Sequence, residues 1–271
     1  MKSTALFIFS AFLFLTSCNE KHEKSNSESG GWVDRVINKD NGPIKEKEFK
    51  GDFDEIEVSQ AIDAEIIKSD IEKVVISAPE NIMNEVMVDN NGGRLHIHYK
   101  PGIRIMNSTK VSAKIYAKDF SKLVANSAAK ITVKDKFMQE KTDITISSAA
   151  SILGDLEAND FDISADSSSS FDGKVWAVDL DVETSSAGSI TISGKAKNAE
   201  ITSSSGSSVS AKGVIADHVK ASASSGSSIE ISATSSVKAD ASSGGSVHVS
   251  KKGNITSINK DESSGGSVSI Q

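Results

Sequence analysis

Residues 182–190 read Val-Glu-Thr-Ser-Ser-Ala-Gly-Ser-Ile, and close variants of this stretch recur throughout the second half of the chain. When eight copies are aligned on their last apolar residue, a serine stands four positions before that residue in every copy. Successive aligned residues are 21, 19, 19, 19, 20, 18 and 21 positions apart, so the period is close to 20 residues. The aligned apolar residues are Ile131, Ile152, Phe171, Ile190, Val209, Ile229, Val247 and Val268. The aligned serines are Ser127, Ser148, Ser167, Ser186, Ser205, Ser225, Ser243 and Ser264.

Each repeat is predicted to hold two short strands joined by a turn of small residues. Seven of the eight copies are apolar eight positions before the aligned residue, with Lys260 as the exception. A period near 20 without helical spacing is typical of a β-solenoid. The sequence therefore predicts an all-β fold, a parallel β-helix with about eight coils of 18–21 residues after a β-rich N-terminal segment. A β-sandwich also spaces its strands regularly, but it does not require one serine at one phase eight times.

Stacking of the coils makes two further predictions. Equivalent residues would lie about 4.8 Å apart along the stack, so the aligned serines are expected to hydrogen-bond to the coils above and below. The last coil departs from the repeat, because Lys260 and Glu262 occupy positions that are apolar or small in most earlier coils. Charges at an exposed edge oppose strand pairing between molecules. We therefore expect a largely monomeric protein with weak end-to-end association.

The segment before the repeats is also rich in predicted strands. Residues 94–99 alternate between apolar residues and histidine, and Asn90-Asn-Gly-Gly93 before them is a strong turn signal. A short helix is expected over residues 81–89. The domain organisation predicted for the folded part is residues 48–271, with lead-in strands over 48–120 and repeats over 121–271.

The N-terminus is typical of an exported lipoprotein. Lys2 precedes an apolar run from Ala5 to Leu15, which is too short to span a bilayer and suits a signal peptide. Leu15-Thr-Ser-Cys18 resembles the bacterial lipobox, and Cys18 is the only cysteine. We expect a signal peptide over residues 1–17, lipid attachment at Cys18 and a flexible tether over residues 18–47. The alternative is an ordinary signal peptide with a chance cysteine. The first interpretation predicts a cell-envelope protein, anchored to the outer membrane on a face that the sequence does not specify.

The distribution of charged residues does not point to a reaction. The net charge of −7 argues against a nucleic-acid partner. Arginine occurs only at positions 35, 94 and 104, and the lysines of the repeats fall at differing phases, so no cluster of acid and base groups is expected. His96 and His98 could share a metal, but two ligands without a third are weak evidence. We therefore predict no enzyme activity and no catalytic, cofactor or metal-binding residues.

The repeats, together with Phe53-Asp-Glu-Ile-Glu-Val-Ser-Gln-Ala-Ile-Asp-Ala-Glu-Ile66, resemble the head GIN domain family of auto-transporter adhesins over about residues 48–271. The resemblance implies a β-helical fold in an exported bacterial protein, and it brings no established catalytic or binding residues. Many members carry an aspartate before the aligned apolar residue, whereas this chain has serine there in seven of eight copies. Any ligand role of that aspartate is therefore not expected here.

Three functions fit these observations. The first is a non-enzymatic surface or periplasmic module that presents a Ser/Thr-lined face to a glycan or a protein. The second is a structural envelope component that assembles end to end. The third, which is less favoured, is a carbohydrate-active enzyme of the β-helix type. The partners expected from the first are the membrane, through the lipid, and a glycan or surface protein.

Overall fold

The computed structural model describes residues 35–37, 42–105 and 111–271, which belong to one compact unit, Val33–Gln271. The expected signal peptide, Cys18 and most of the expected tether lie outside the described residues. Regular structure within them consists of strands and one short 3-10 helix, η1 (Met83–Glu85). Across these ranges, no helix has the length and apolar character that a membrane crossing would need.

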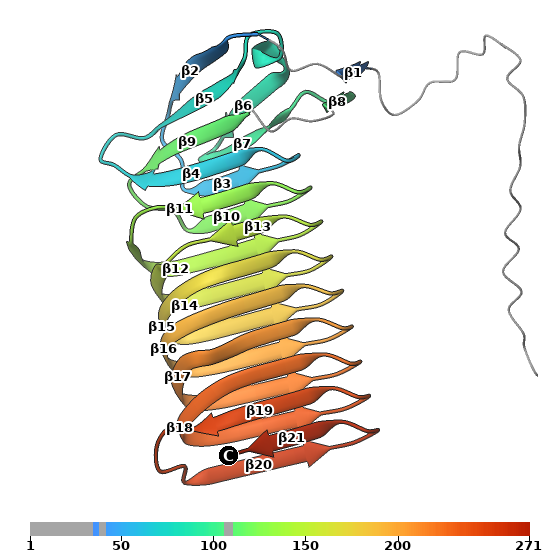
Figure 1. The fold of residues 1–271 in the computed structure, drawn as a ribbon. Coiled ribbons are helices and arrows are strands. Elements are labelled where there is room, and N and C mark those ends of the chain that lie inside the picture. Colours follow the sequence, from blue (N-terminus) through green and yellow to red (C-terminus); the bar gives the residue numbers. More distant parts are fainter. Residues whose placement is uncertain (1–34, 38–41, 106–110) are drawn as a thin grey trace, which may run out of the picture. The chain divides into compact units, whose positions relative to one another are not determined.

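A parallel β-solenoid forms most of this unit, which confirms the predicted fold class (Figure 1). Its coils turn at the right of the view, where the strands before and after each small-residue segment meet. The solenoid strands are β3 (Glu55–Val58), β4 (Asp63–Lys68), β10 (Lys122–Ala125), β11 (Lys130–Val133), β12 (Phe137–Ile146), β13 (Ser151–Leu153), β14 (Leu156–Ala165), β15 (Ser170–Thr184), β16 (Ser189–Ser203), β17 (Ser208–Ala223), β18 (Ser228–Ala241), β19 (Ser246–Lys251), β20 (Ser257–Glu262) and β21 (Ser267–Ile270).

The alignment of the repeats is also the register of the strands. Ile190 pairs with Phe171 on one side and Val209 on the other, and Val182 pairs with Ile163 and Ile201 in the same way. The register continues N-terminally, because Leu123 pairs with Ile56 in β3. The strands β3 and β4 therefore form one more coil, without the aligned serine, ahead of the eight that carry it.

The N-terminal end of the stack is closed by a cap of largely antiparallel strands. These are β2 (Ile44–Lys50), β5 (Lys73–Pro79), β6 (Val86–Asn91), β7 (Arg94–Tyr99) and β9 (Ser112–Ala117). Strands β7 and β9 pair parallel with β3 and β4, and the rest of the cap then pairs antiparallel. A separate two-stranded parallel sheet joins β1 (Arg35–Ile37) and β8 (Ile103–Ile105).

Two details of this cap differ from the sequence-based expectations. The helix expected over residues 81–89 is wrong, because only η1 forms and Val86 already begins β6. The alternating apolar residues of β6 pair with β7 across the expected turn at residues 90–93, and this pairing outweighs local helix formation. Strand β2 begins at Ile44, inside the segment expected to be a tether. Its side chains are almost all exposed and charged, as suits the edge strand of a sheet.

The turns contain two consecutive residues in the left-handed conformation. In one coil these are Ser186 (φ 51°) and Ala187 (φ 62°), and the other seven serine-marked coils repeat the pattern. Positive φ at both central residues defines a type I′ turn. The aligned serines are exposed, and their hydroxyls make no hydrogen bond within the described ranges. The hydroxyl ladder expected of these serines is therefore wrong. The serines one position before the aligned apolar residues do make one such contact, in which Ser208 Oγ donates to Ser189 Oγ at 3.4 Å. Backbone groups connect the turns instead, because the N–H of Ser168 donates to the carbonyl of Ser186 at 3.0 Å.

Buried hydroxyls two residues further along do bond between coils. Ser169 and Ser207 donate to backbone carbonyls of the preceding coil at 2.9 and 3.0 Å. Gly188 occupies the equivalent position in the coil between them and has no hydroxyl. Thr184 supplies it from the other side of the turn, donating to the equivalent carbonyl, that of Ala165, at 2.9 Å. A backbone carbonyl of the preceding coil therefore accepts a hydroxyl hydrogen bond at all three turns, although the donor is a serine in two of them and a threonine in the third.

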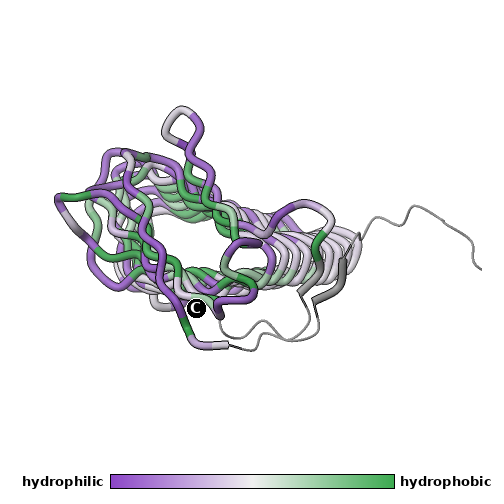
Figure 2. The backbone as a smooth tube through the Cα atoms, turned by 90° about the horizontal axis from the view of Figure 1, so that it is seen from above, coloured by the Kyte–Doolittle hydropathy of each residue, from purple (hydrophilic) through white to green (hydrophobic). Residues whose placement is uncertain are grey.

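The interior is a stack of apolar columns. Figure 2 looks along the stack and shows hydrophobic residues recurring at the same places around the ring. Ile190 and Ile201 are completely buried, and the rings of Phe120 and Phe137 lie 4.8 Å apart near the cap. Thr142 is an exception, because it is completely buried and its hydroxyl has no partner within the described ranges.

After the second strand of a coil the chain bends and runs back to the next coil, and we call this part the return segment. Return segments stack at the left of Figure 1, opposite the turns. Gly194 makes one bend possible, because its φ is +128° and a Cβ there would lie 2.0 Å from the carbonyl oxygen of Val175. All variation in coil length falls in the return segments, since the two aligned columns are always eight residues apart across the turn.

The C-terminal end of the stack carries charges where earlier coils carry core residues. Lys260 and Glu262 stack on the buried Ala239 and Ala241. The Lys260 ammonium lies 3.0 Å from Glu262 Oε1, which also accepts the backbone N–H of Val268 at 2.6 Å. This hydrogen bond and the ammonium lower the pKa of Glu262. A charged pair therefore lies over the open end of the solenoid.

Candidate functional site

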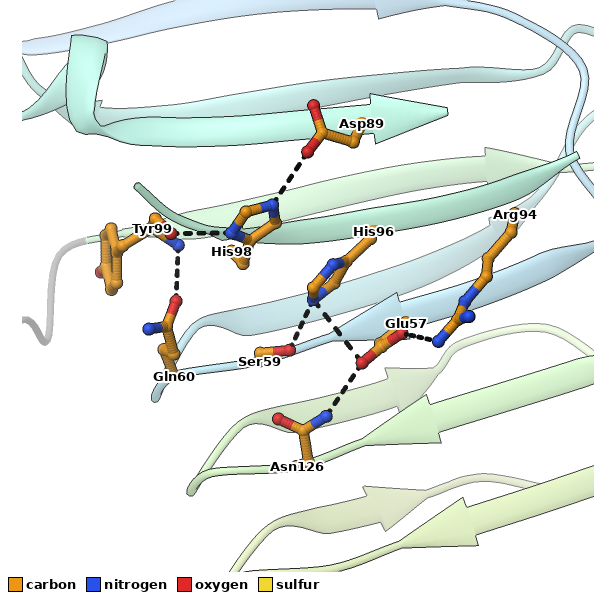
Figure 3. A network of polar contacts seen from close by, with 9 residues as sticks. All are labelled: Glu57, Ser59, Gln60, Asp89, Arg94, His96, His98, Tyr99 and Asn126. Atoms are coloured by element: carbon orange, nitrogen blue, oxygen red, sulfur yellow. Dashed lines mark hydrogen bonds and ion pairs between the residues drawn. The ribbon is translucent and has the colours of Figure 1, made fainter. Parts of the chain in front are cut away.

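The two histidines singled out in the sequence belong to a polar network on the cap and the first coil (Figure 3). Both project from β7, and their rings stack with centroids 4.1 Å apart. His96 Nε2 lies 2.8 Å from Ser59 Oγ and 3.6 Å from Glu57 Oε1. His98 Nε2 lies 3.0 Å from Asp89 Oδ2, and its Nδ1 lies 2.7 Å from the carbonyl oxygen of Tyr99. Each imidazole is thus held by its own partners.

Glu57 is the centre of this network, because it is almost completely buried and must be balanced by cations and donors. Arg94 contacts its Oε2 at 2.5 Å, and Asn126 donates to its Oε1 at 3.0 Å. Burial lowers the pKa of His96, with smaller contributions from His98 and Arg94, while Glu57 and Asp89 oppose the shift. No group of three or more potential metal ligands occurs in the ranges that the structure describes. The network connects β7 to β3 through side chains as well as through the backbone.

A second group of residues, which the sequence analysis did not single out, surrounds Trp176 on the return segments. Consecutive coils place Met138, Glu157, Trp176, Lys195 and Ile215 in one outward-facing column. A hollow of about 580 Å³ opens beside this column, and a second of about 340 Å³ lies on the other side of Trp176. Glu157 and Trp176 line both hollows, so the indole is part of the wall between them.

The indole of Trp176 is free to contact a ligand. The residue is 46% exposed although Val175 and Ala177 beside it are buried. Lysines stack on other aromatic rings, such as that of Phe137, but no cation or aromatic ring covers Trp176 within the described part of the chain. Its N–H also has no hydrogen-bond partner there. Exposed aromatic faces with a free polar edge are common at binding sites.

Lysines from three coils gather around the larger hollow. Lys136 lies 2.5 Å from Glu157 Oε1, and Lys134 lies 3.5 Å from Glu65 Oε1. Lys174 and Lys195 are exposed and take part in no ion pair among the residues described. Counted from the aligned apolar residues, two of these lysines stand three positions on and two stand five positions on, and the return segments bring all four together. The site therefore combines an aromatic face with two uncompensated cations, which suits binding better than catalysis.

The chain belongs to the family described as "Putative auto-transporter adhesin, head GIN domain", whose model matches residues 52–253. This confirms the family resemblance found in the sequence. The family is described by adhesion rather than by a reaction.

Three solved structures share this fold at low sequence identity. A "putative adhesin" from Parabacteroides distasonis matches with a TM-score of 0.78 and 19% identity, covering 88% of this chain and all of that one. A "putative adhesin" from Parabacteroides merdae gives 0.74 and 19%, covering 84% and 98%. A "Putative lipid binding protein" from P. distasonis gives 0.73 and 18%, covering 88% and 100%. No curated protein matches the chain.

Proposed function

We propose that the protein is a non-enzymatic adhesin of the cell envelope that binds a glycan or a surface protein at the return segments around Trp176. The exposed indole between the two hollows is the observation that carries this proposal. A solenoid supports such a site well, because each coil is hydrogen-bonded to its neighbours and little conformational entropy is lost on binding. The adhesin description of the family supports the same role.

The proposal includes an anchor. Lipid attached to Cys18 would hold the protein to the outer membrane, and the segment that follows would let the solenoid stand away from the surface. Replacing Cys18 with alanine should leave an exported precursor without lipid. Metabolic labelling with a radioactive or clickable fatty acid tests this, and lipid label on the variant would contradict the proposal.

Adhesion is tested with purified protein and a glycan array together with immobilised extracellular proteins. Trp176→Ala should abolish most of the binding, while the matched control Ile215→Ala should retain it. Ile215 lies in the same outward column, two coils from Trp176, and is 39% exposed. Both residues are exposed, so neither change should alter the circular dichroism spectrum. Equal binding by the two variants would contradict the proposed site.

End-to-end assembly is the second candidate, and the open C-terminal strands favour it. Strands β20 and β21 have no strand on their outer side within the described residues, and Ile258 is 52% exposed. The charged pair of Lys260 and Glu262 opposes this association, so the wild-type protein should be mostly monomeric. Replacing both with valine should increase self-association in sedimentation runs. A double variant that stays monomeric would remove the support for this candidate.

A further inference from the structure

We propose that the larger hollow beside Trp176 binds a sugar residue that carries a carboxylate, so that the ligand is an acidic glycan. The inference rests on the proposed adhesin function and specifies the chemistry of its ligand. Three features of the hollow carry it: an uncovered aromatic face, two ammonium groups without an ion pair, and a tryptophan N–H without a hydrogen-bond partner in the described structure.

The aromatic face selects for a flat apolar surface such as the C–H face of a pyranose ring. No aromatic residue adjoins Trp176 in its column, since its neighbours there are Glu157 one coil before and Lys195 one coil after. A sugar ring stacked on the indole would therefore have a charged group within one coil spacing, about 4.8 Å, on each side. The sugar ring would stack on the tryptophan, and its substituents would contact the charged groups of Glu157 and Lys195.

Two ammonium groups without an ion pair lie next to the indole. Lys174 lies two residues before Trp176 on the same outward face, and Lys195 is its register partner in the next coil. The carboxylate of Glu157 is already paired with Lys136 at 2.5 Å. Asp135 and Asp155 also line the hollow and make no ion pair among the described residues. Each accepts a backbone N–H instead, from Lys68 at 2.9 Å and from Lys174 at 3.0 Å. Lys174 and Lys195 are thus left to bind an anion from the ligand.

One uncharged donor belongs to the same surface. The N–H of the exposed Trp176 has no partner among the described residues, and a hydroxyl oxygen of a sugar can accept from it. The volume of the larger hollow, about 580 Å³, lies in the usual range for small-ligand sites. A chain of sugars could therefore lie across the return segments with its acidic residue beside the lysines.

The neighbouring surface holds few free charges. Five residues further along the same strands, an outward column carries Asp143, Asp162, Asp181 and Glu200 in four successive coils. Lysines pair with three of these carboxylates, and only Asp181 has no ion pair among the described residues. The favourable position for an anionic ligand is therefore beside Lys174 and Lys195.

The test uses protein purified from cells that express the full chain, with tri-galacturonate as the probe and its fully methyl-esterified form as the neutral match. Calorimetric titration in 50 mM salt should show at least 10-fold weaker binding of the neutral probe. Lys174→Gln with Lys195→Gln should weaken tri-galacturonate binding at least 10-fold and leave the neutral probe within about 2-fold. Lys238→Gln, an exposed lysine on another part of the solenoid, is the control and should change neither.

The outcomes separate this inference from the proposed function. If both probes bind equally and Trp176→Ala abolishes both, the acidic specificity is refuted while the glycan-binding function stands. If neither probe binds but Trp176→Ala still abolishes adhesion to an immobilised protein, the ligand is a protein and the inference is overturned. If Trp176→Ala changes neither probe binding nor adhesion, the site itself is wrong and both proposals fail.

Discussion

Replacing Thr142 with valine is expected to stabilise the protein. Thr142 lies in β12, is completely buried and has a hydroxyl without a hydrogen-bond partner in the described structure. In the next coils its register partners are Phe161 and Leu180, so the column is otherwise apolar. A buried polar group without a partner costs about 1–3 kcal/mol. Valine has nearly the same shape and removes that cost without opening a cavity. We expect the free energy of unfolding to rise by about 2 kcal/mol.

Thermal unfolding followed by circular dichroism measures this effect, which corresponds to about 4–8 °C in Tm for a domain of this size. Because solenoids unfold coil by coil as well as globally, hydrogen exchange of the amides in β12 should slow in parallel. The matched control is Thr145→Val on the same strand. Thr145 is half-buried and donates to Asp143 Oδ1 at 3.4 Å, so its loss should lower Tm slightly. A Tm for Thr142→Val below that of the wild type would refute the reasoning, because the hydroxyl would then have a stabilising partner.

Three further predictions concern the stack and its charges. Ile190→Asp should lower the free energy of unfolding by several kcal/mol, because it places a carboxylate in the dry core. Ser186→Ala, in an exposed turn, should lower it by about 0.5 kcal/mol or less. Equal urea midpoints for the two variants would contradict the assignment of Ile190 to the core and Ser186 to the surface. Burial lowers the pKa of His96, so its contribution to stability is present above about pH 6.5 and is lost as the pH falls through the folded-state pKa. His96→Gln should flatten the fall in Tm between pH 7 and 5, and an unchanged slope would argue against it. Burial and then Glu183 raise the pKa of Asp181, so stability falls as the pH rises through that pKa. Asp181→Asn should raise Tm at pH 7, most at low salt, and a decrease would contradict this.

The serine phase predicts the register because the turn has one fixed length. Eight residues separate the two aligned columns in every copy, so an alignment by eye coincides with the hydrogen-bonded pairing. The coil formed by β3 and β4 escapes this alignment, since its turn is made by Gln60 and Ala61. Their φ values, 60° and 56°, match those of the serine turns. The backbone conformation is what the fold requires, and serine is one of several residues that can adopt it.

The antiparallel cap is predictable only in part. The alternation of β7 and the turn before it are visible in the sequence, but a strand pattern does not show whether the partner runs parallel or antiparallel. Strand β2 is harder still. Its charged side chains face solvent or pair with those of β5, as when Lys73 contacts Glu48 at 2.9 Å. Only Phe49 of this strand packs against the core, so there is no apolar period from which the strand could be recognised.

The candidate site could not be found from the repeat phase. Return segments span 10–13 positions between the aligned columns of successive coils, so equal phase does not identify neighbours there. Lys136 and Lys195 both stand five positions after their aligned residues, yet the register places Lys195 in the column of Met138. One signal was available. Trp176 stands between Val175 and Ala177, and the alternation of a strand places it outward when those two are buried. A large apolar residue at an outward position is informative in a chain that has only two tryptophans.

The fixed length of the turn and the equal length of three coils determine how the solenoid could gain or lose coils in evolution. Between Ile152 and Val209 each coil advances the chain by 19 residues, so duplication or loss of one 19-residue unit would add or remove one rung without disturbing the pairing of the others. Each event would change the separation of the two ends by about 4.8 Å. The separation between the capped end and the charged end can therefore evolve in discrete increments. Because these coils carry Lys174, Trp176 and Lys195, each such event would also repeat or remove part of the proposed site.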